Sequence, residues 1–231
     1  MIIKHPTEAD KEGLIALWVE AFEEPREAAE TFFATAFSQE RSMICREGDT
    51  VAAGLYWFDC CRKGKKVAYI YAVATGKAYR GRGLCHRLME KTHEILKGRG
   101  YVGAILVPAE GSLFDFYGKM GYLPCCPGGI PGEKLTDKMA EEMGLTPISM
   151  EEYLEKQKAL LPEDAVLHTA AAYRYLKHFG EFYAYPQGIL CKIEEDIQER
   201  LPHKPEGEMA SMYLPLTEDT RLPAYFAHPL A

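Results

Sequence analysis

The stretch AYRGRGLCHRL, residues 78–88, decides how the N-terminal half of this 231-residue chain is interpreted. Gly81 and Gly83 alternate with Arg80 and Arg82 and run directly into a segment with helical spacing. Glycine weakens helices and strands, so two glycines at the start of a helix indicate that something approaches the backbone closely. The first amides of a helix lack intrahelical partners and carry partial positive charge, which attracts phosphate oxygens. The stretch therefore predicts an anion-binding loop, with a plain tight turn as the alternative.

Two familiar phosphate-binding loops do not fit this stretch. A P-loop places four residues between its first glycine and a Gly-Lys-Ser/Thr sequence, which is absent here. A dinucleotide-binding fingerprint needs a third glycine, and His86 stands at that position. The loop predicts phosphate binding of another kind.

Hydrophobic periodicity and turn residues predict a mixed α/β order around the loop. We expect strands at residues 2–4, 41–46, 51–59, 66–75 and 101–107, a capping box at 7–10 followed by a helix, and further helices at 28–37, 84–97 and 112–120. The Gly- and Pro-rich segment 125–134 marks a boundary. Beyond it we expect helices at 151–160 and 163–179 and strands at 181–185, 189–193, 209–214 and 222–226.

Two motifs in this order resemble a known family. The sequences VATGKAYRGRGLCHRLME (73–90) and SLFDFYGKMGY (112–122) are similar to the acetyl-CoA-binding core of the GCN5-related N-acetyltransferase (GNAT) superfamily. The family signature is Arg/Gln-x-x-Gly-x-Gly/Ala, and the segment 80–85 matches it except that Cys85 replaces the last small residue. The resemblance covers about residues 1–125.

The resemblance implies a GNAT-type α/β fold, with a mixed, mostly antiparallel sheet and helices on both faces. We expect a GNAT core at residues 1–130 and a small C-terminal α/β extension at 131–231 that packs on it, as in some bacterial members of the superfamily. The extension is either a lid that completes the core or a wall of the acceptor pocket.

The resemblance also implies the site residues. Backbone groups of Val73, Ala74 and Thr75 would bind the pantetheine arm and the thioester carbonyl, and Tyr117 would protonate the departing thiolate. The pyrophosphate would lie in the loop formed by Arg80, Gly81, Arg82, Gly83, Leu84, Cys85 and His86. A phenol, with an ordinary pKa of about 10, is protonated at neutral pH and is suited to this acid role. The alternative for Tyr117 is a core tyrosine.

The expected activity is acetyl transfer from acetyl-CoA to a primary amine of a small molecule or peptide, by direct attack in a ternary complex. The alternative is a catalytically silent acyl-CoA-binding protein. Family members often carry a glutamate as general base on the strand before the loop or on the next one, but the segments 66–75 and 101–107 contain no carboxylate. The general base is therefore unassigned: the candidates are an ordered water, Glu110, and Glu23 or Glu24. A substrate amine with a low pKa would need no base from the protein.

Composition narrows the remaining possibilities. A net charge of −7 argues against a nucleic-acid binder. Seven cysteines without a CxxC motif indicate reduced thiols, and the scattered histidines predict no metal site. The chain has no run of 18 apolar residues, and residues 1–6 lack the apolar stretch of a signal peptide. We expect a cytoplasmic protein without a membrane partner, and the sequence leaves a homodimer open.

Overall fold

The computed structural model describes residues 1–127, 133–202 and 209–227. The chain divides into two compact units, each built from segments distant in sequence. The first unit comprises Met1–Cys60, Lys66–Leu106 and Leu214–Thr220, and the second comprises Cys61–Lys65, Val107–Tyr213 and Arg221–Ala231. These units do not coincide with the ranges 1–130 and 131–231, which stay a prediction about functional domains.

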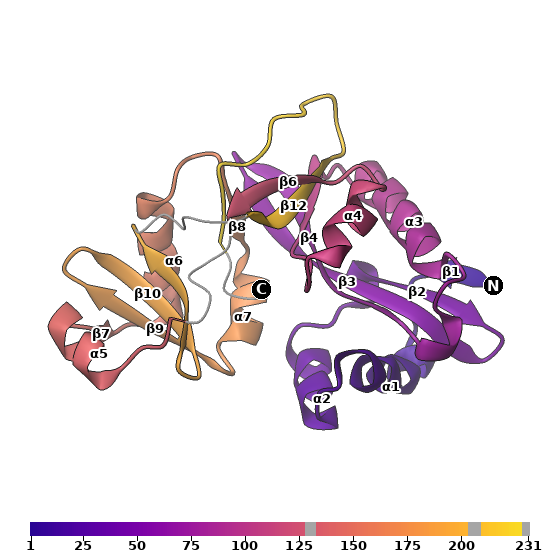
Figure 1. The fold of residues 1–231 in the computed structure, drawn as a ribbon, viewed down its shortest axis with the longest axis horizontal. Helices are drawn as coiled ribbons and strands as arrows, with labels where there is room; N and C mark the ends of the chain where they lie inside the picture. Colours follow the sequence, from indigo (N-terminus) through magenta and orange to yellow (C-terminus); the bar gives the residue numbers. More distant parts are fainter. Residues whose placement is uncertain (128–132, 203–208, 228–231) are drawn as a thin grey trace. The chain divides into compact units, whose positions relative to one another are not determined.

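The first unit contains a mostly antiparallel sheet. Its strand order is β1 (Ile2–Lys4), β2 (Ser42–Glu47), β3 (Thr50–Arg62), β4 (Lys65–Thr75) and β5 (Gly103–Leu106) (Figure 1). Strands β1 and β2, and β2 and β3, pair antiparallel, whereas β4 and β5 pair parallel. Lys63 and Gly64 both have positive φ angles, of 49° and 74°, as a two-residue hairpin turn requires. The five strands expected in this region are confirmed.

Helices of the first unit cover both faces of this sheet (Figure 1). The helical elements are η1 (Glu8–Asp10), α1 (Lys11–Phe22), α2 (Arg26–Thr35), η2 (Gln39–Arg41), η3 (Lys77–Tyr79) and α3 (Leu84–Gly98). On the face of α1 and α2, the ring centroid of Phe32 lies 4.8 Å from that of Trp18 and 4.9 Å from that of Tyr56 on β3. On the other face, Leu84 and Leu88 of α3 are buried. Apolar side chains at helical spacing thus bury against the sheet, which is the main source of helix stability.

Asp10 fixes the start of α1. Its carboxylate accepts hydrogen bonds from the Thr7 backbone N–H at 2.8 Å and from Lys4 Nζ at 2.9 Å. Burial by itself would raise the pKa of Asp10, but the bonds from Lys4 and Thr7 outweigh it and lower the pKa to about 2. The predicted capping box is confirmed.

A segment from near the C-terminus completes the first unit. The Leu216 N–H donates to the Val102 carbonyl at 2.9 Å, just before β5 begins. This contact joins residues far apart in the chain, and no local sequence pattern predicts it.

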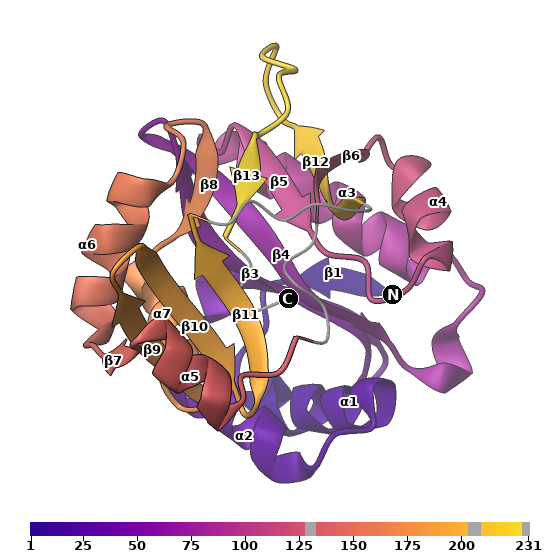
Figure 2. The ribbon, with the colours of Figure 1, turned by 60° about the vertical axis from the view of Figure 1, so that its left-hand side comes forward.

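The second unit contains a four-stranded sheet, ordered β11, β10, β9 and β7 (Figure 2). Its elements are α4 (Ser112–Gly118), β6 (Leu123–Pro127), α5 (Asp137–Met143), β7 (Thr146–Pro147), α6 (Met150–Leu160), β8 (Ala165–His168), α7 (Ala170–Leu176), β9 (Gly180–Tyr185), β10 (Gly188–Ile193), β11 (Asp196–Leu201), β12 (Met209–Pro215, up to Tyr213) and β13 (Tyr225–Phe226). Outside the four-stranded sheet, β12 pairs antiparallel with β6, and β13 pairs parallel with β8. The Ser149 hydroxyl caps α6 by accepting from the Glu152 N–H at 3.1 Å.

The helix predicted at 163–179 is wrong in its first part. Residues 165–168 form β8, and the helix α7 begins only at Ala170. Ala165 and Val166 pair with Tyr225 and Phe226 of β13. A strand partner so distant in the chain overrides the helical spacing, because strand preference depends on packing against neighbours.

A buried carboxylate organises the interior of the second unit. Glu199 of β11 is 1% exposed and accepts hydrogen bonds from the Tyr153 hydroxyl, from Gln157 Nε2 at 2.6 Å and from the Tyr225 hydroxyl at 3.0 Å. Tyr173 extends the network by donating to Gln157 Oε1 at 2.7 Å. Each member therefore has a hydrogen-bonding partner, as buried polar groups require.

Over residues 1–127, 133–202 and 209–227, no helix combines the length and apolar character that a membrane span needs.

Candidate functional site

The glycine-rich loop leads into α3 with two residues in the left-handed backbone conformation. Gly81 has a φ of +74° and Gly83 a φ of +70°, a region that L side chains rarely adopt. A Cβ added to Gly81 would meet no atom within 4 Å, so the backbone angle, rather than crowding by this chain, is what requires glycine there. The helical ladder begins with the Arg87 N–H, which donates to the Gly83 carbonyl at 3.2 Å. The amides of residues 84–86 precede that bond and are the unpaired donors of the helix start.

Arginine side chains donate hydrogen bonds to one carbonyl of the loop and to one at the end of β4. Arg87 Nη2 donates to the Arg82 carbonyl at 2.8 Å, and Arg80 Nε donates to the Thr75 carbonyl at 3.2 Å. These bonds tie the loop to the first turn of α3 and to the strand before it. Arg87 lies four residues after Gly83, a helical spacing from which sequence analysis could have found it.

The Arg82 guanidinium is already partnered. Its Nη2 lies 2.7 and 2.9 Å from the two carboxylate oxygens of Glu47, and its Cζ lies 5.6 Å from the ring centroid of Tyr79. Glu47 ends β2, 35 residues earlier in the chain, and no sequence signal connects it with the loop. These contacts fix the orientation of the arginine, and the Glu47 carboxylate partly neutralises its charge.

Strand β4 extends beyond its pairing with β5. The parallel register covers Val67, Ala68 and Tyr69 and ends at the pair Tyr69 and Ile105, whereas β4 continues to Thr75. The edge of 73–75 on that side is therefore not paired with β5, although the Thr75 carbonyl already accepts from Arg80 Nε at 3.2 Å. The structure thus brings Val73, Ala74 and Thr75 together with the loop at the end of one strand.

Ala72, just before this open segment, has a φ of 48°, which sequence analysis missed. Alanine carries no signal for such an angle, which costs a non-glycine residue about 1–2 kcal/mol. The residue interrupts the extended backbone at the place where β4 and β5 have separated. Backbone strain of this kind gathers at functional sites.

Comparing two Ala→Gly substitutions tests this strain. Ala74 lies in the same strand without a positive φ, so Ala74→Gly should destabilise the protein by about 0.5–1 kcal/mol. Ala72→Gly should be about 1–2 kcal/mol more favourable than Ala74→Gly, because it releases the left-handed penalty. Urea unfolding of the two variants measures the difference, and equal destabilisation would show that Ala72 is not strained.

Cys85 and His86 complete the first turn of α3. Burial raises the pKa of the half-buried Cys85 to about 11, so its thiol is neutral at pH 7 and adds no charge to the loop. His86 Nε2 lies 3.3 Å from Glu90 Oε1, and both side chains are exposed. Leu84 is buried and anchors the turn to the sheet.

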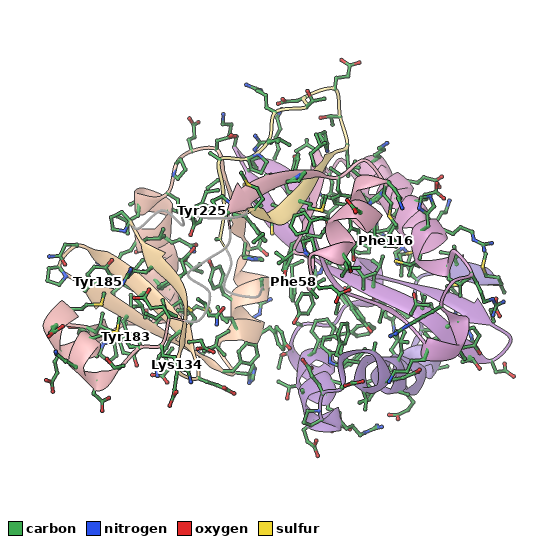
Figure 3. The ribbon with its side chains drawn as sticks, viewed as in Figure 1. Phe58, Phe116, Lys134, Tyr183, Tyr185 and Tyr225 are labelled. Atoms are coloured by element: carbon green, nitrogen blue, oxygen red, sulfur yellow. The ribbon has the colours of Figure 1, made fainter. Side chains whose placement is uncertain are left out.

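Tyr117 lies on α4, in the second unit. It is 7% exposed, and its ring centroid lies 5.2 Å from that of Phe116 (labelled in Figure 3) and 5.9 Å from that of Tyr122. An open cavity of about 480 Å³ on this unit is lined by Phe114, Asp115, Gly118, Lys119, Tyr122, Pro124 and Met212. The aromatic packing accords with a core residue.

The three glutamates considered as bases all have local partners. Glu24 Oε2 accepts from Trp18 Nε1 at 2.7 Å, and Glu23 Oε1 lies 3.3 Å from Lys77 Nζ. Glu110 accepts from the Ser112 hydroxyl at 2.5 Å. All three are exposed, and none is singled out as the base.

Among the residues that the structure describes, no three His, Cys, Asp or Glu side chains are arranged to hold a metal ion.

A glycine-rich loop at the start of a helix, following a strand that has left its neighbour, lies in a mixed α/β domain. A family model described as an acetyltransferase (GNAT) domain matches residues 2–125, more than half of the chain. The chain therefore belongs to the GNAT acetyltransferase family, a family of acyltransferase enzymes. The predicted superfamily is confirmed.

Solved structures agree on the fold. A GCN5-related N-acetyltransferase from Anabaena variabilis has a TM-score of 0.63 at 18% identity, covering 94% of this chain and 59% of its own. Eis1 from Mycobacterium abscessus has a TM-score of 0.60 at 13% identity, covering 83% and 53%. YhbS of Escherichia coli, a GNAT family N-acetyltransferase in complex with CoA, has a TM-score of 0.53 at 14% identity, covering 98% and 89%. The chain thus spans little more than half the length of the first two.

Identities this low establish the fold alone, and the predicted mixed α/β GNAT fold is confirmed. A search of curated proteins found no match.

Proposed function

We propose that this protein is an N-acetyltransferase that moves the acetyl group of acetyl-CoA to a primary amine of a small molecule or peptide, by direct attack in a ternary complex. The observation that carries the proposal is the left-handed pair Gly81 and Gly83 at the start of α3, in a chain of the GNAT family. The CoA in the YhbS structure supports the choice of co-substrate.

Each part of the site has a role in this proposal. Amides of residues 81–86 bind the pyrophosphate, assisted by the charges of Arg80 and Arg82. Backbone groups of 73–75 bind the pantetheine arm, and a strand amide stabilises the charge that develops on the thioester oxygen. Tyr117 donates a proton to the CoA thiolate as it leaves. Holding amine and thioester together supplies much of the acceleration.

Thiol release from acetyl-CoA tests the function directly. Polyamines, aminoglycosides, amino acids and peptides are offered as acceptors, and at least one class should release CoA. If CoA raises the melting temperature but no acceptor releases thiol, the protein is a silent acyl-CoA-binding protein instead.

We also propose a reducing, cytoplasmic location, because all seven cysteines are free thiols. A homodimer remains a prediction.

Reversing the charge of Arg82 tests the loop. Arg82→Glu places an anion beside the proposed pyrophosphate position and next to Glu47, so CoA affinity should fall at least tenfold, about 1.4 kcal/mol. Isothermal titration with CoA measures the effect.

Arg26→Glu is the matched control for this experiment. Arg26 is as exposed as Arg82, at 49% of its side chain, and it also pairs with a glutamate, Glu12, at 2.8 Å. Its reversal should leave CoA affinity nearly unchanged. Equal affinities for both variants would exclude the loop as the pyrophosphate site.

A further inference from the structure

The chain contains two pairs of adjacent cysteines, one in a regular part of a strand and the other at a β-bulge. Cys60 and Cys61 lie in β3, where Cys60 is buried and Cys61 is exposed. This is the alternation of a regular strand, whose successive side chains point to opposite faces. The thiols of that pair therefore point away from each other.

Cys125 and Cys126 lie instead at a β-bulge in β6. Ser211 of β12 is opposite Cys126, and Met212 is opposite Pro124, so Cys125 is the extra residue. A bulge of this kind re-aims a side chain. As a result the Cys125 and Cys126 side chains lie close enough for each to shift the pKa of the other.

Ser211 fixes the bulge from the facing strand. Its hydroxyl lies 3.3 Å from Cys125 Sγ and donates to the Cys126 carbonyl at 3.4 Å. Cys126 Sγ also lies 3.5 Å from the Pro223 carbonyl oxygen. The two sulfurs and the hydroxyl thus form a cluster within one unit.

Cys125 is the reactive member of the pair. It is half-buried, whereas Cys126 is buried behind it. The adjacent Cys126 thiol lowers the pKa of Cys125 against the effect of burial, with help from Ser211 and the nearby charge of Arg62. The proximity of Cys125, together with burial, raises the pKa of Cys126.

A direct bond between the two sulfurs does not suit this geometry. Adjacent Cα atoms are about 3.8 Å apart, below the range of about 4.4–6.8 Å that unstrained disulfides span. A single atom that binds both sulfurs avoids this strain, because it lets them stay further apart than in a disulfide.

We propose that Cys125 and Cys126 form a dithiol site for a thiophilic centre that bridges two sulfurs, of the chemical class of trivalent arsenic. The site is independent of the acetyltransferase function. Its chemistry involves no redox step. A hydrated organoarsenical, R–As(OH)₂, loses one hydroxyl as water when the Cys125 thiol bonds to arsenic. It loses the second as water when the Cys126 thiol follows, leaving R–As bonded to both sulfurs. The second bond forms readily because it is intramolecular.

Phenylarsine oxide is the probe. After desalting, the native wild-type protein should retain one phenylarsenic group per chain, measured by intact mass spectrometry. Cys125→Ser and Cys126→Ala should each reduce retention at least tenfold, while Cys61→Ser should retain the full amount. Retention that survives Cys125→Ser, or that is lost in Cys61→Ser, would overturn the proposal.

Two further measurements guard against misfolded variants and single-bond labelling. In denaturant, where both pairs are flexible, Cys125→Ser should bind one phenylarsenic group at Cys60 and Cys61, which shows that the native bulge creates the selectivity. From native wild type, dimercaptopropanol should release the probe and an equal concentration of thiol as 2-mercaptoethanol should not. Release by the monothiol would show attachment through one sulfur and contradict the proposal.

Discussion

Replacing Tyr117 by phenylalanine is expected to lower kcat about 100-fold, because proton transfer by a positioned side chain contributes about 10²–10⁴-fold. The substitution removes one oxygen and keeps the ring that packs against Phe116 and Tyr122. CoA affinity should therefore change little. Steady-state kinetics with the best acceptor give kcat, and calorimetry gives the affinity for CoA.

Tyr122→Phe is the matched control for Tyr117. Tyr122 is buried on the same unit, 5.9 Å away between ring centroids, and has no role in the proposed chemistry. Its rate should stay within a fewfold of wild type. An unchanged rate for Tyr117→Phe would remove Tyr117 from the acid role and identify it as a core residue.

Replacing Glu199 by leucine should lower the free energy of unfolding by about 3–5 kcal/mol, because each buried donor left without a partner costs about 1–3 kcal/mol. The donors that lose their acceptor are the Tyr153 hydroxyl, Gln157 Nε2 and the Tyr225 hydroxyl (Tyr225 is labelled in Figure 3). Burial raises the pKa of both tyrosines, so at neutral pH they remain protonated donors. Urea unfolding followed by circular dichroism measures the loss.

The exposed pair Tyr183 and Glu181 supplies the control. The Tyr183 hydroxyl also donates to a glutamate, but the Glu181 side chain is exposed to water. Glu181→Leu should change the free energy of unfolding by less than about 1 kcal/mol, since water replaces the lost acceptor. Similar losses in the two leucine variants would contradict the role assigned to the buried network.

Glu199 also predicts how stability depends on pH. Burial raises its pKa in the folded protein, against the effect of its three hydrogen bonds. The folded state therefore holds the proton more tightly than the unfolded state, where the pKa is about 4.3. The resulting stability is fully present below about pH 4.3 and is lost as pH rises through the folded pKa.

Glu199→Gln does not titrate and isolates this contribution. The free energy of unfolding of wild type, relative to that of Glu199→Gln, should fall as pH rises above about 4.3. A difference that is flat or that rises with pH would show that the folded pKa is not raised.

The sequence by itself determined the glycine-rich loop before α3 and most of the elements around it. Gly81 and Gly83 can be interpreted from the local sequence, because only glycine adopts a left-handed φ angle freely. The capping pair Thr7 and Asp10, the hairpin turn at 62–65 and the apolar stripe of α3 are likewise set by neighbours in sequence. The family resemblance rested on the two motifs at 73–90 and 112–122, and it is confirmed. The roles of Tyr117 and of the backbone at 73–75 remain predictions.

Only the tertiary structure decided the features that depend on distant partners. Residues 165–168 form a strand because β13 pairs with them. Arg82 is oriented by Glu47, which lies 35 residues earlier in the chain. Glu199 is buried only because α6 and β13 bring three donors to it. Helical and strand periodicity reports which side of an element is apolar. It carries no information about which distant donor, acceptor or strand edge the fold will place against that side, and those partners determine backbone strain, charge and burial.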